Sequence, residues 1–172
     1  MTQLKNNELK GITRLELSEN LTSFPEEIFK LADSLEVLDL SNNQLTDLPH
    51  DLHRLHNLKI LFCSNNLFTH LPQSMGACKK LEMIGFKSNQ IKTVSDAALP
   101  EITRWLILTD NKIEALPDTF GKLKRLQKLA LAGNQLQVLP QSFGLCKSLE
   151  LIRLSANQLT HFPDGLLQLP KL

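Results

Sequence analysis

Leucines recur along the chain in a fixed pattern with a period of about 23 residues, and this repeat constrains the fold more than any other feature. The clearest copy, residues 35–57, reads LEVLDLSNNQLTDLPHDLHRLHN. Leu38 and Leu40 alternate with Asp39, which predicts a short strand with both leucines on one face. Because one repeat cannot cover its own apolar face, the strands of successive repeats must lie side by side and share a core. The sequence therefore predicts a parallel sheet with one strand per repeat.

The repeat divides nearly the whole chain into seven units. Before them, residues 1–11 are predicted to form a partial repeat that caps the first unit, because Leu4 and Leu9 have the spacing of two core leucines. Leu172 falls on the first leucine position of an eighth unit, which indicates a fragment of a longer protein or an end covered by a partner. The predicted units are residues 12–34, 35–57, 58–80, 81–102, 103–125, 126–148 and 149–171.

The first, fourth and fifth units depart from the pattern. The first has lost one residue after Asn20. The fourth is one residue short after Val94, and Ser95 replaces its proline. The fifth starts at Thr103, where leucine is expected. We therefore expect a local irregularity where the fourth and fifth units meet, around residues 97–102.

Seven successive copies of the pattern resemble the leucine-rich-repeat family, whose consensus is L-x-x-L-x-L-x-x-N-x-L. The second half of each unit is similar to the 23-residue subclass found in intracellular scaffold proteins, and the whole is similar to the N-terminal region of bacterial leucine-rich-repeat protein kinases. The resemblance implies an α/β fold, a right-handed solenoid with a curved parallel sheet on its concave face. Short 3-10, turn or extended segments are expected on the convex face, where proline limits regular helix.

Every unit carries an asparagine at the same position. A side-chain amide has two donor hydrogens and an acceptor oxygen, so it can bond backbone groups in its own loop and in the neighbouring repeat. A buried amide without partners costs roughly 1–3 kcal/mol. Because these asparagines share one position, we interpret them as a buried structural ladder. The predicted ladder consists of Asn20, Asn43, Asn66, Asn89, Asn111, Asn134 and Asn157.

The composition and motifs of the sequence argue against catalysis, and against nucleic acid or a membrane as partner. The net charge is +1, which gives no electrostatic reason to expect nucleic acid or a membrane surface as partner. No apolar run is long enough to span a bilayer. The sequence contains no catalytic or metal-binding motif, and no acidic pair in a core position. We therefore expect neither an enzyme nor a cofactor.

Two groups of residues are of types that could bind a metal ion or take part in redox chemistry. His50, His53 and His56 step by three, so one 3-10 turn could align them for a metal ion. Their positions belong to the variable convex side, which favours solvated surface residues. The cysteines occupy leucine positions, which favours small buried hydrophobes without disulfides: Cys63, Cys78 and Cys146. With no secretory signal visible, these cysteines favour a cytoplasmic protein.

The residues that flank the two strand leucines are predicted to project from the concave sheet. In the middle repeats several of them are apolar, and they form a stripe whose ends are polar. A contiguous apolar patch with a polar rim is typical of a binding surface, and tryptophan is enriched in such patches. The predicted partner-binding residues are Val37, Asp39, Ile60, Phe62, Met83, Lys87, Trp105, Ile107, Lys128, Leu151 and Arg153.

We therefore predict a protein-protein interaction module that binds a protein or peptide of unknown identity on its concave face. Three alternatives stay open. The chain could be a regulatory segment of a larger signalling enzyme such as a kinase, or it could form a homodimer through the concave face or the C-terminal end. The apolarity of the stripe could also be incidental, or a segment missing from this chain could cover it. A fourth concerns Trp105 alone, which could instead tuck inward beside Thr103 and fill the irregular fifth unit.

Overall fold

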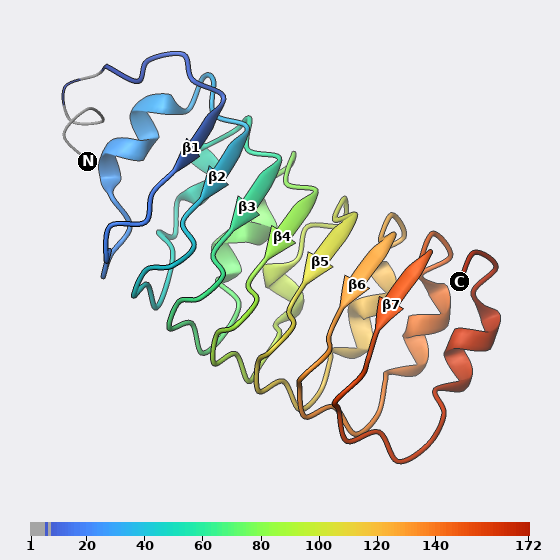
Figure 1. The fold of residues 1–172 in the computed structure, drawn as a ribbon. Coiled ribbons are helices and arrows are strands. Elements are labelled where there is room, and N and C mark those ends of the chain that lie inside the picture. Colours follow the sequence, from blue (N-terminus) through green and yellow to red (C-terminus); the bar gives the residue numbers. More distant parts are fainter. Residues whose placement is uncertain (1–5, 7) are drawn as a thin grey trace.

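The structure, a computed structural model, describes residue 6 and residues 8–172. Seven strands of three residues form one parallel sheet in chain order, and a 3-10 helix on the opposite side follows each strand (Figure 1). The strands are β1 (Arg14–Glu16), β2 (Val37–Asp39), β3 (Ile60–Phe62), β4 (Met83–Gly85), β5 (Trp105–Ile107), β6 (Lys128–Ala130) and β7 (Leu151–Arg153). The 3-10 helices are η1 (Glu26–Leu31), η2 (Leu52–Arg54), η3 (Gln73–Ala77), η4 (Asp96–Ala98), η5 (Asp118–Lys122), η6 (Gln141–Leu145) and η7 (Asp164–Gln168).

The core lies between the sheet and the helices, where the strand leucines meet those of the second half of each repeat. The middle residue of each strand pairs in register with that of the next, and Leu38, Leu61 and Ile84 are fully buried. Their flanking neighbours project away from the core, as the alternation predicts. The predicted α/β solenoid is confirmed.

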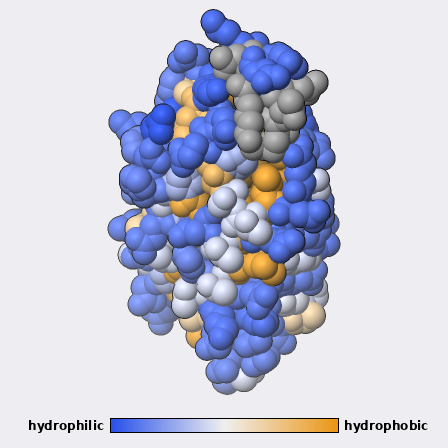
Figure 2. Space-filling view, turned by 90° about the vertical axis from the view of Figure 1, so that its left-hand side faces the viewer, coloured by the Kyte–Doolittle hydropathy of each residue, from blue (hydrophilic) through white to orange (hydrophobic). Residues whose placement is uncertain are grey.

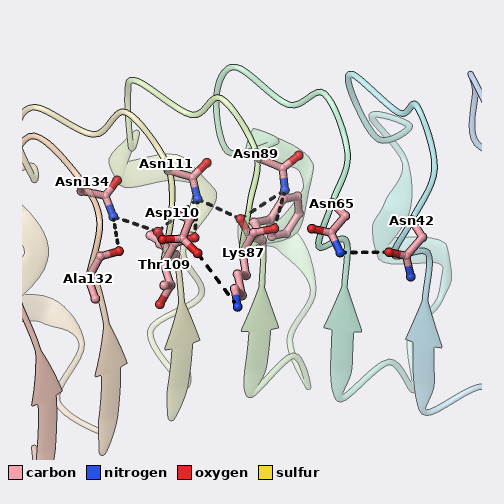
Figure 3. Close-up of polar contacts among 11 residues, drawn as sticks. Asn42, Asn65, Lys87, Asn89, Thr109, Asp110, Asn111, Ala132 and Asn134 are labelled. Carbon is pink, nitrogen blue, oxygen red and sulfur yellow. Dashed lines mark hydrogen bonds and ion pairs between the residues drawn. The ribbon is translucent and has the colours of Figure 1, made fainter. Parts of the chain in front are cut away.

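The asparagine ladder joins each repeat to the one before it (Figure 3). The amide nitrogen of Asn89 donates to the carbonyl oxygen of Phe86 in its own turn and to that of Cys63 in the preceding repeat, at 3.1 and 3.0 Å. Its amide oxygen accepts from the backbone N–H of Phe68 at 3.1 Å. The same pattern holds for Asn43, Asn66, Asn111, Asn134 and Asn157, the last of which is only half-buried.

The prediction that Asn20 belongs to this ladder is wrong. Its side chain is exposed, and its backbone adopts the left-handed region with φ of 55°. The turn of the first repeat is one residue shorter, and the Oδ1 atom of Asn43 accepts from Leu21 N–H just after it.

The junction of the fourth and fifth repeats is built differently from the others, as expected. A proline immediately precedes most of the 3-10 helices, whereas Ser95 precedes η4, and its side-chain oxygen accepts from the N–H of Ala97 at 3.2 Å. Thr103 is fully buried in the leucine position, and its hydroxyl donates to the carbonyl oxygen of Pro100 at 2.6 Å. This bond satisfies the one polar side-chain atom that replaces a leucine there.

The two ends of the solenoid are covered to different extents. At the N-terminal end, Leu9 packs against the core and its carbonyl oxygen accepts from Ile12 N–H; Leu4, the other residue of the predicted cap, lies outside the described residues. At the C-terminal end, Ile152 and Leu154 are only half-buried, although the equivalent positions of the preceding repeat are fully buried.

We predict that Asn89→Ala lowers the free energy of unfolding by roughly 1–3 kcal/mol, because it leaves the buried Phe68 N–H without a partner and removes one of the two amide bonds to each of the Cys63 and Phe86 carbonyl oxygens. Urea denaturation followed by circular dichroism measures the change. Gln90→Ala is the matched control, since the adjacent Gln90 is exposed and should shift stability by less than about 0.5 kcal/mol. Equal losses in the two variants would contradict a structural role for the ladder.

Neighbouring 3-10 helices approach closely at Gly76, where a Cβ atom would overlap the carbonyl oxygen of Ala97. Backbone cannot move aside as a flexible side chain can, so we predict that Gly76→Ala costs roughly 1–3 kcal/mol of stability. Gly165→Ala is the control, because the nearest atom to its added Cβ would be 3.4 Å away. We expect that control to be neutral or slightly stabilising in thermal unfolding. A tolerated Gly76→Ala would show that the helices are free to separate.

Candidate binding face

The concave face consists of the outward side chains of the sheet, arranged in rows that run across the strands. Residues that share a row are paired in register along the whole sheet. The first row contains Arg14, Val37, Ile60, Met83, Trp105, Lys128 and Leu151. The second row contains Glu16, Asp39, Phe62, Gly85, Ile107, Ala130 and Arg153. Lys87 follows β4 and lies at the edge of the same face.

The apolar side chains of the two rows are half-buried and lie outside the core. Val37, Ile60 and Phe62 keep part of their surface accessible, as do Met83 and Ile107. They occupy adjacent strands, so they form one continuous apolar stripe across β2 to β5. In the structure these residues therefore lie on an open face, as the alternation of the strand residues predicts.

Phe62 and Gly85 form a contact that the sequence pattern does not reveal. A Cβ atom at Gly85 would lie 2.6 Å from Cδ1 of the Phe62 ring, so the ring lies across the place where the next strand lacks a side chain. Gly85 is buried beneath it. The glycine thus lets the aromatic ring lie flat and keeps the stripe continuous. A large ring followed one repeat later by glycine in the same row is the signal that could have indicated this contact.

Trp105 lies on the concave face and does not tuck inward. Its side chain is half-buried, and the ammonium of Lys128 lies 3.9 Å from the centre of the indole ring, a cation–π geometry. Thr103 fills the inward position instead. Beside this pair a hollow of about 350 Å³ opens between Ile107 and Arg153.

The charges of the concave face differ from end to end. Glu16 and Asp39 lie on β1 and β2 and outnumber Arg14, whose guanidinium lies 4.0 Å from the Glu16 carboxylate, whereas Lys128 and Arg153 lie on β6 and β7. Asp39 also holds its own strand end, since its carboxylate accepts from the N–H of the residue two positions on, at 2.9 Å. The face is therefore acidic toward its N-terminal end and basic toward its C-terminal end.

The two edges of the face carry ion pairs between neighbouring repeats. After the strands, the Lys87 ammonium lies 3.9 Å from the Asp110 carboxylate (Figure 3). Before the strands, Lys59 pairs with Glu36 at 2.8 Å, and Arg104 lies 3.3 Å from Glu82. The alternating signs along that second edge largely cancel.

The histidines and acidic residues of the convex side do not form a metal site. Across residues 8–172, no three histidine, cysteine or acidic side chains are grouped so as to hold a metal ion. His50, His53 and His56 are exposed. Nearby, a hydrogen bond of 3.0 Å from Arg54 lowers the pKa of the half-buried Asp51 carboxyl. These groups form ordinary solvated surface.

The three cysteines are free and buried. Burial raises the pKa of the Cys78 and Cys146 thiols from 9.0 to about 11, and it raises the pKa of the fully buried Cys63 thiol well above 9.0. All three therefore stay protonated at neutral pH, where a thiol is a poor nucleophile. They serve as core side chains, as their leucine positions predict.

The side of the molecule that lies to the left in Figure 1 is mainly hydrophilic. Figure 2 views the left-hand side of the molecule in Figure 1 and shows blue atoms interrupted by small, separate orange areas. None of the helices in the described part of the chain has the length and apolar character needed to cross a bilayer. Exposed apolar side chains also lie outside the sheet near the C-terminal end, among them Val138 and Phe162, which line a common hollow; the concave stripe differs from them in running in register across four strands.

The inward residues of this curved sheet repeat from strand to strand, whereas its outward residues vary. This combination defines a solenoid of the kind that recognises other molecules. The models named "Leucine rich repeat" and "Leucine Rich repeats (2 copies)" match the chain, the first over residues 103–159 and 124–172 and the second over residues 33–73. Together these matches cover more than half of the sequence, and the chain belongs to the leucine-rich-repeat family. No curated protein is significantly similar to it.

Solved structures share the fold over almost the whole chain. A leucine-rich-repeat protein of Leptospira interrogans is 30% identical, with a TM-score of 0.74 over 96% of this chain. An internalin of Listeria monocytogenes is 23% identical, with a TM-score of 0.79 over 98%, and a plant peptide hormone receptor in complex with RGF2 is 27% identical, with a TM-score of 0.77 over 98%. The chain spans 48% of the length of each of the first two and 28% of the third.

These relatives define the general role of the fold. Leucine-rich repeats form a protein-interaction module, and such domains are typically binding modules without catalytic activity. Fold alone does not identify what is bound, because the outward residues change independently of the frame.

We predict that the thiols of the native protein resist Ellman's reagent at pH 8 and react after unfolding in urea, because burial holds them neutral and covered. The contribution of these thiols to the free energy of unfolding is complete below pH 9 and is lost as the pH rises from 9.0 toward 11. The reason is that the folded state keeps the thiol protons to a higher pH than the unfolded state does.

The control for that pH dependence is a chain with Cys78→Ala and Cys146→Ala. Its unfolding free energy should fall less steeply between pH 9 and 11, when both chains are measured by urea denaturation. Rapid labelling of the native protein at pH 8 would contradict the buried positions of the thiols.

Proposed function

We propose that this chain recognises a protein or peptide partner through its concave face and performs no chemistry itself. The observation that carries the proposal is the apolar stripe across β2 to β5, which stays partly exposed on a regular, rigid sheet. Exposed contiguous apolar surface with charged residues around it is the usual mark of a protein-binding site.

The chemistry of the stripe is suited to specific binding. Trp105 is the single tryptophan of the chain, and tryptophan is among the residues that contribute most to binding energy. Burying roughly 300–400 Å² of the stripe is worth about 8–10 kcal/mol before the costs of association, which are several kcal/mol or more. These magnitudes favour a moderate affinity, to which the charged rim adds steering.

The plant receptor structure supports a peptide as the kind of partner, since the same fold is bound there to RGF2. A cytoplasmic location is part of the proposal, and the three free cysteines favour it, because thiols stay reduced in that compartment. A second copy of the chain is the competing partner for the same face.

We expect Phe62→Glu or Trp105→Glu to abolish capture of the partner by the immobilised chain from extracts of the native source. Each change places a charge in the apolar stripe while leaving the core leucines untouched. Capture followed by mass spectrometry measures the loss, and circular dichroism checks that the fold is intact.

Val138→Glu is the matched control, because Val138 is an exposed apolar residue outside the strands, 66% accessible. It should capture the partner as the original chain does. Unchanged capture by both concave variants would exclude this face as the binding site. Dimers that disappear on dilution in light scattering, and that Trp105→Glu also abolishes, would identify the partner as a second copy.

A further inference from the structure

Three cationic side chains surround the hollow at the C-terminal half of the concave face. Lys87 follows β4, Lys128 lies on β6 and Arg153 on β7, and all three line the hollow. Between them the surface is formed by Ile107 and by Ala130, whose short side chain leaves the space open. The site thus combines an apolar floor with a positively charged rim.

Most of the positive charge of this rim is not neutralised by the described residues. No carboxylate among the described residues forms a salt bridge with Lys128 or Arg153. Lys87 reaches Asp110 only at 3.9 Å, and both side chains are more than half exposed, so water weakens that pair. Lys128 is held in place by the Trp105 ring rather than by an acid.

We infer that the hollow binds a carboxylate of an extended peptide segment, next to an apolar or aromatic side chain of the same peptide. Arg153 and Lys128 donate hydrogen bonds to the carboxylate, and the neighbouring apolar side chain packs on Trp105 and Ile107. Charge-assisted bonds of this kind are stronger than neutral ones. The inference rests on the proposed function and adds to it the chemistry of the partner.

The charge difference along the face also orients the peptide. At the opposite end Glu16 and Asp39 outnumber Arg14 and repel a carboxylate, so the acidic part of the peptide lies over β5 to β7. From β2 to β7 the sheet extends about 24 Å, which roughly seven residues of extended peptide can cross. The apolar stripe between the two ends then receives the uncharged part of the peptide.

The distribution of charge favours a peptide over nucleic acid. A phosphate backbone needs a long series of cations, whereas the edge before the strands alternates Glu36, Lys59, Glu82 and Arg104. The net charge of the chain is only +1. A single acidic group beside an apolar side chain matches the short cationic rim.

The test is selection of random peptides displayed on phage against the immobilised full chain. We expect the retained peptides to be enriched in aspartate or glutamate beside an aromatic or aliphatic residue, relative to the unselected library. A synthetic peptide of the most frequent retained sequence is then titrated by calorimetry. Lys128→Glu and Arg153→Glu should each weaken its binding at least about tenfold, and replacing the peptide carboxylate by its amide should have a similar effect.

Lys122→Glu is the matched control, because it makes the same charge change at an exposed residue of η5 on the opposite side. It should leave the affinity unchanged, and the losses in the concave variants should shrink in high salt. The inference would be overturned by retained peptides without acidic enrichment, or by equal affinity of the unchanged chain and the Lys128→Glu variant. Neither result would affect the proposal that a partner binds through the face that contains Trp105. If the chain retains no more peptide than the Trp105→Glu variant does, the inference also fails. The proposed function is then decided separately, by capture of the native partner.

Discussion

A ladder of asparagine amides, one in each repeat from the second onward, holds the solenoid together, and the alignment of the strands depends on it. The amide group of Asn111, for example, donates to carbonyl oxygens in two consecutive repeats and accepts an N–H from the loop between them. Without these bonds the tight turn after each strand would bury unpaired backbone groups, which is costly in a dry interior. With them, each strand starts and ends at the same height as its neighbour, and the side chains of the sheet form straight rows.

Those rows separate the residues that specify the fold from the residues available for recognition. Inward positions such as Leu106 and Leu129 are fully buried and interchangeable with other aliphatic residues of similar size. Outward positions such as Trp105 and Lys128 make no core contact that the frame requires. A binding surface of this design can change its chemistry without loss of stability, which is why family membership leaves the partner open.

The periodic part of the structure could be predicted from sequence, because a repeat shows the same physical choice many times. The strands, their register and the outward placement of Ile60 and Met83 all follow from alternation and period. The exceptions depended on contacts between repeats. Asn20 has the ladder residue type, but the shorter turn of its repeat leaves its side chain exposed, and the amide of Asn43 accepts from the Leu21 N–H after it. The contact of Phe62 with Gly85 depends on which rotamer an aromatic ring adopts over an empty position, which no pattern within one repeat encodes.

The ladder also has a direction. Each of its amides donates to a carbonyl oxygen of the preceding repeat, as Asn134 does to Leu108, and none of these bonds extends to a repeat that follows. During synthesis the N-terminal repeats leave the ribosome first, so every new asparagine meets acceptors that are already in place. Each new repeat therefore brings with it the amide that joins it to the repeat before it, and the chain can grow by adding one coil at a time.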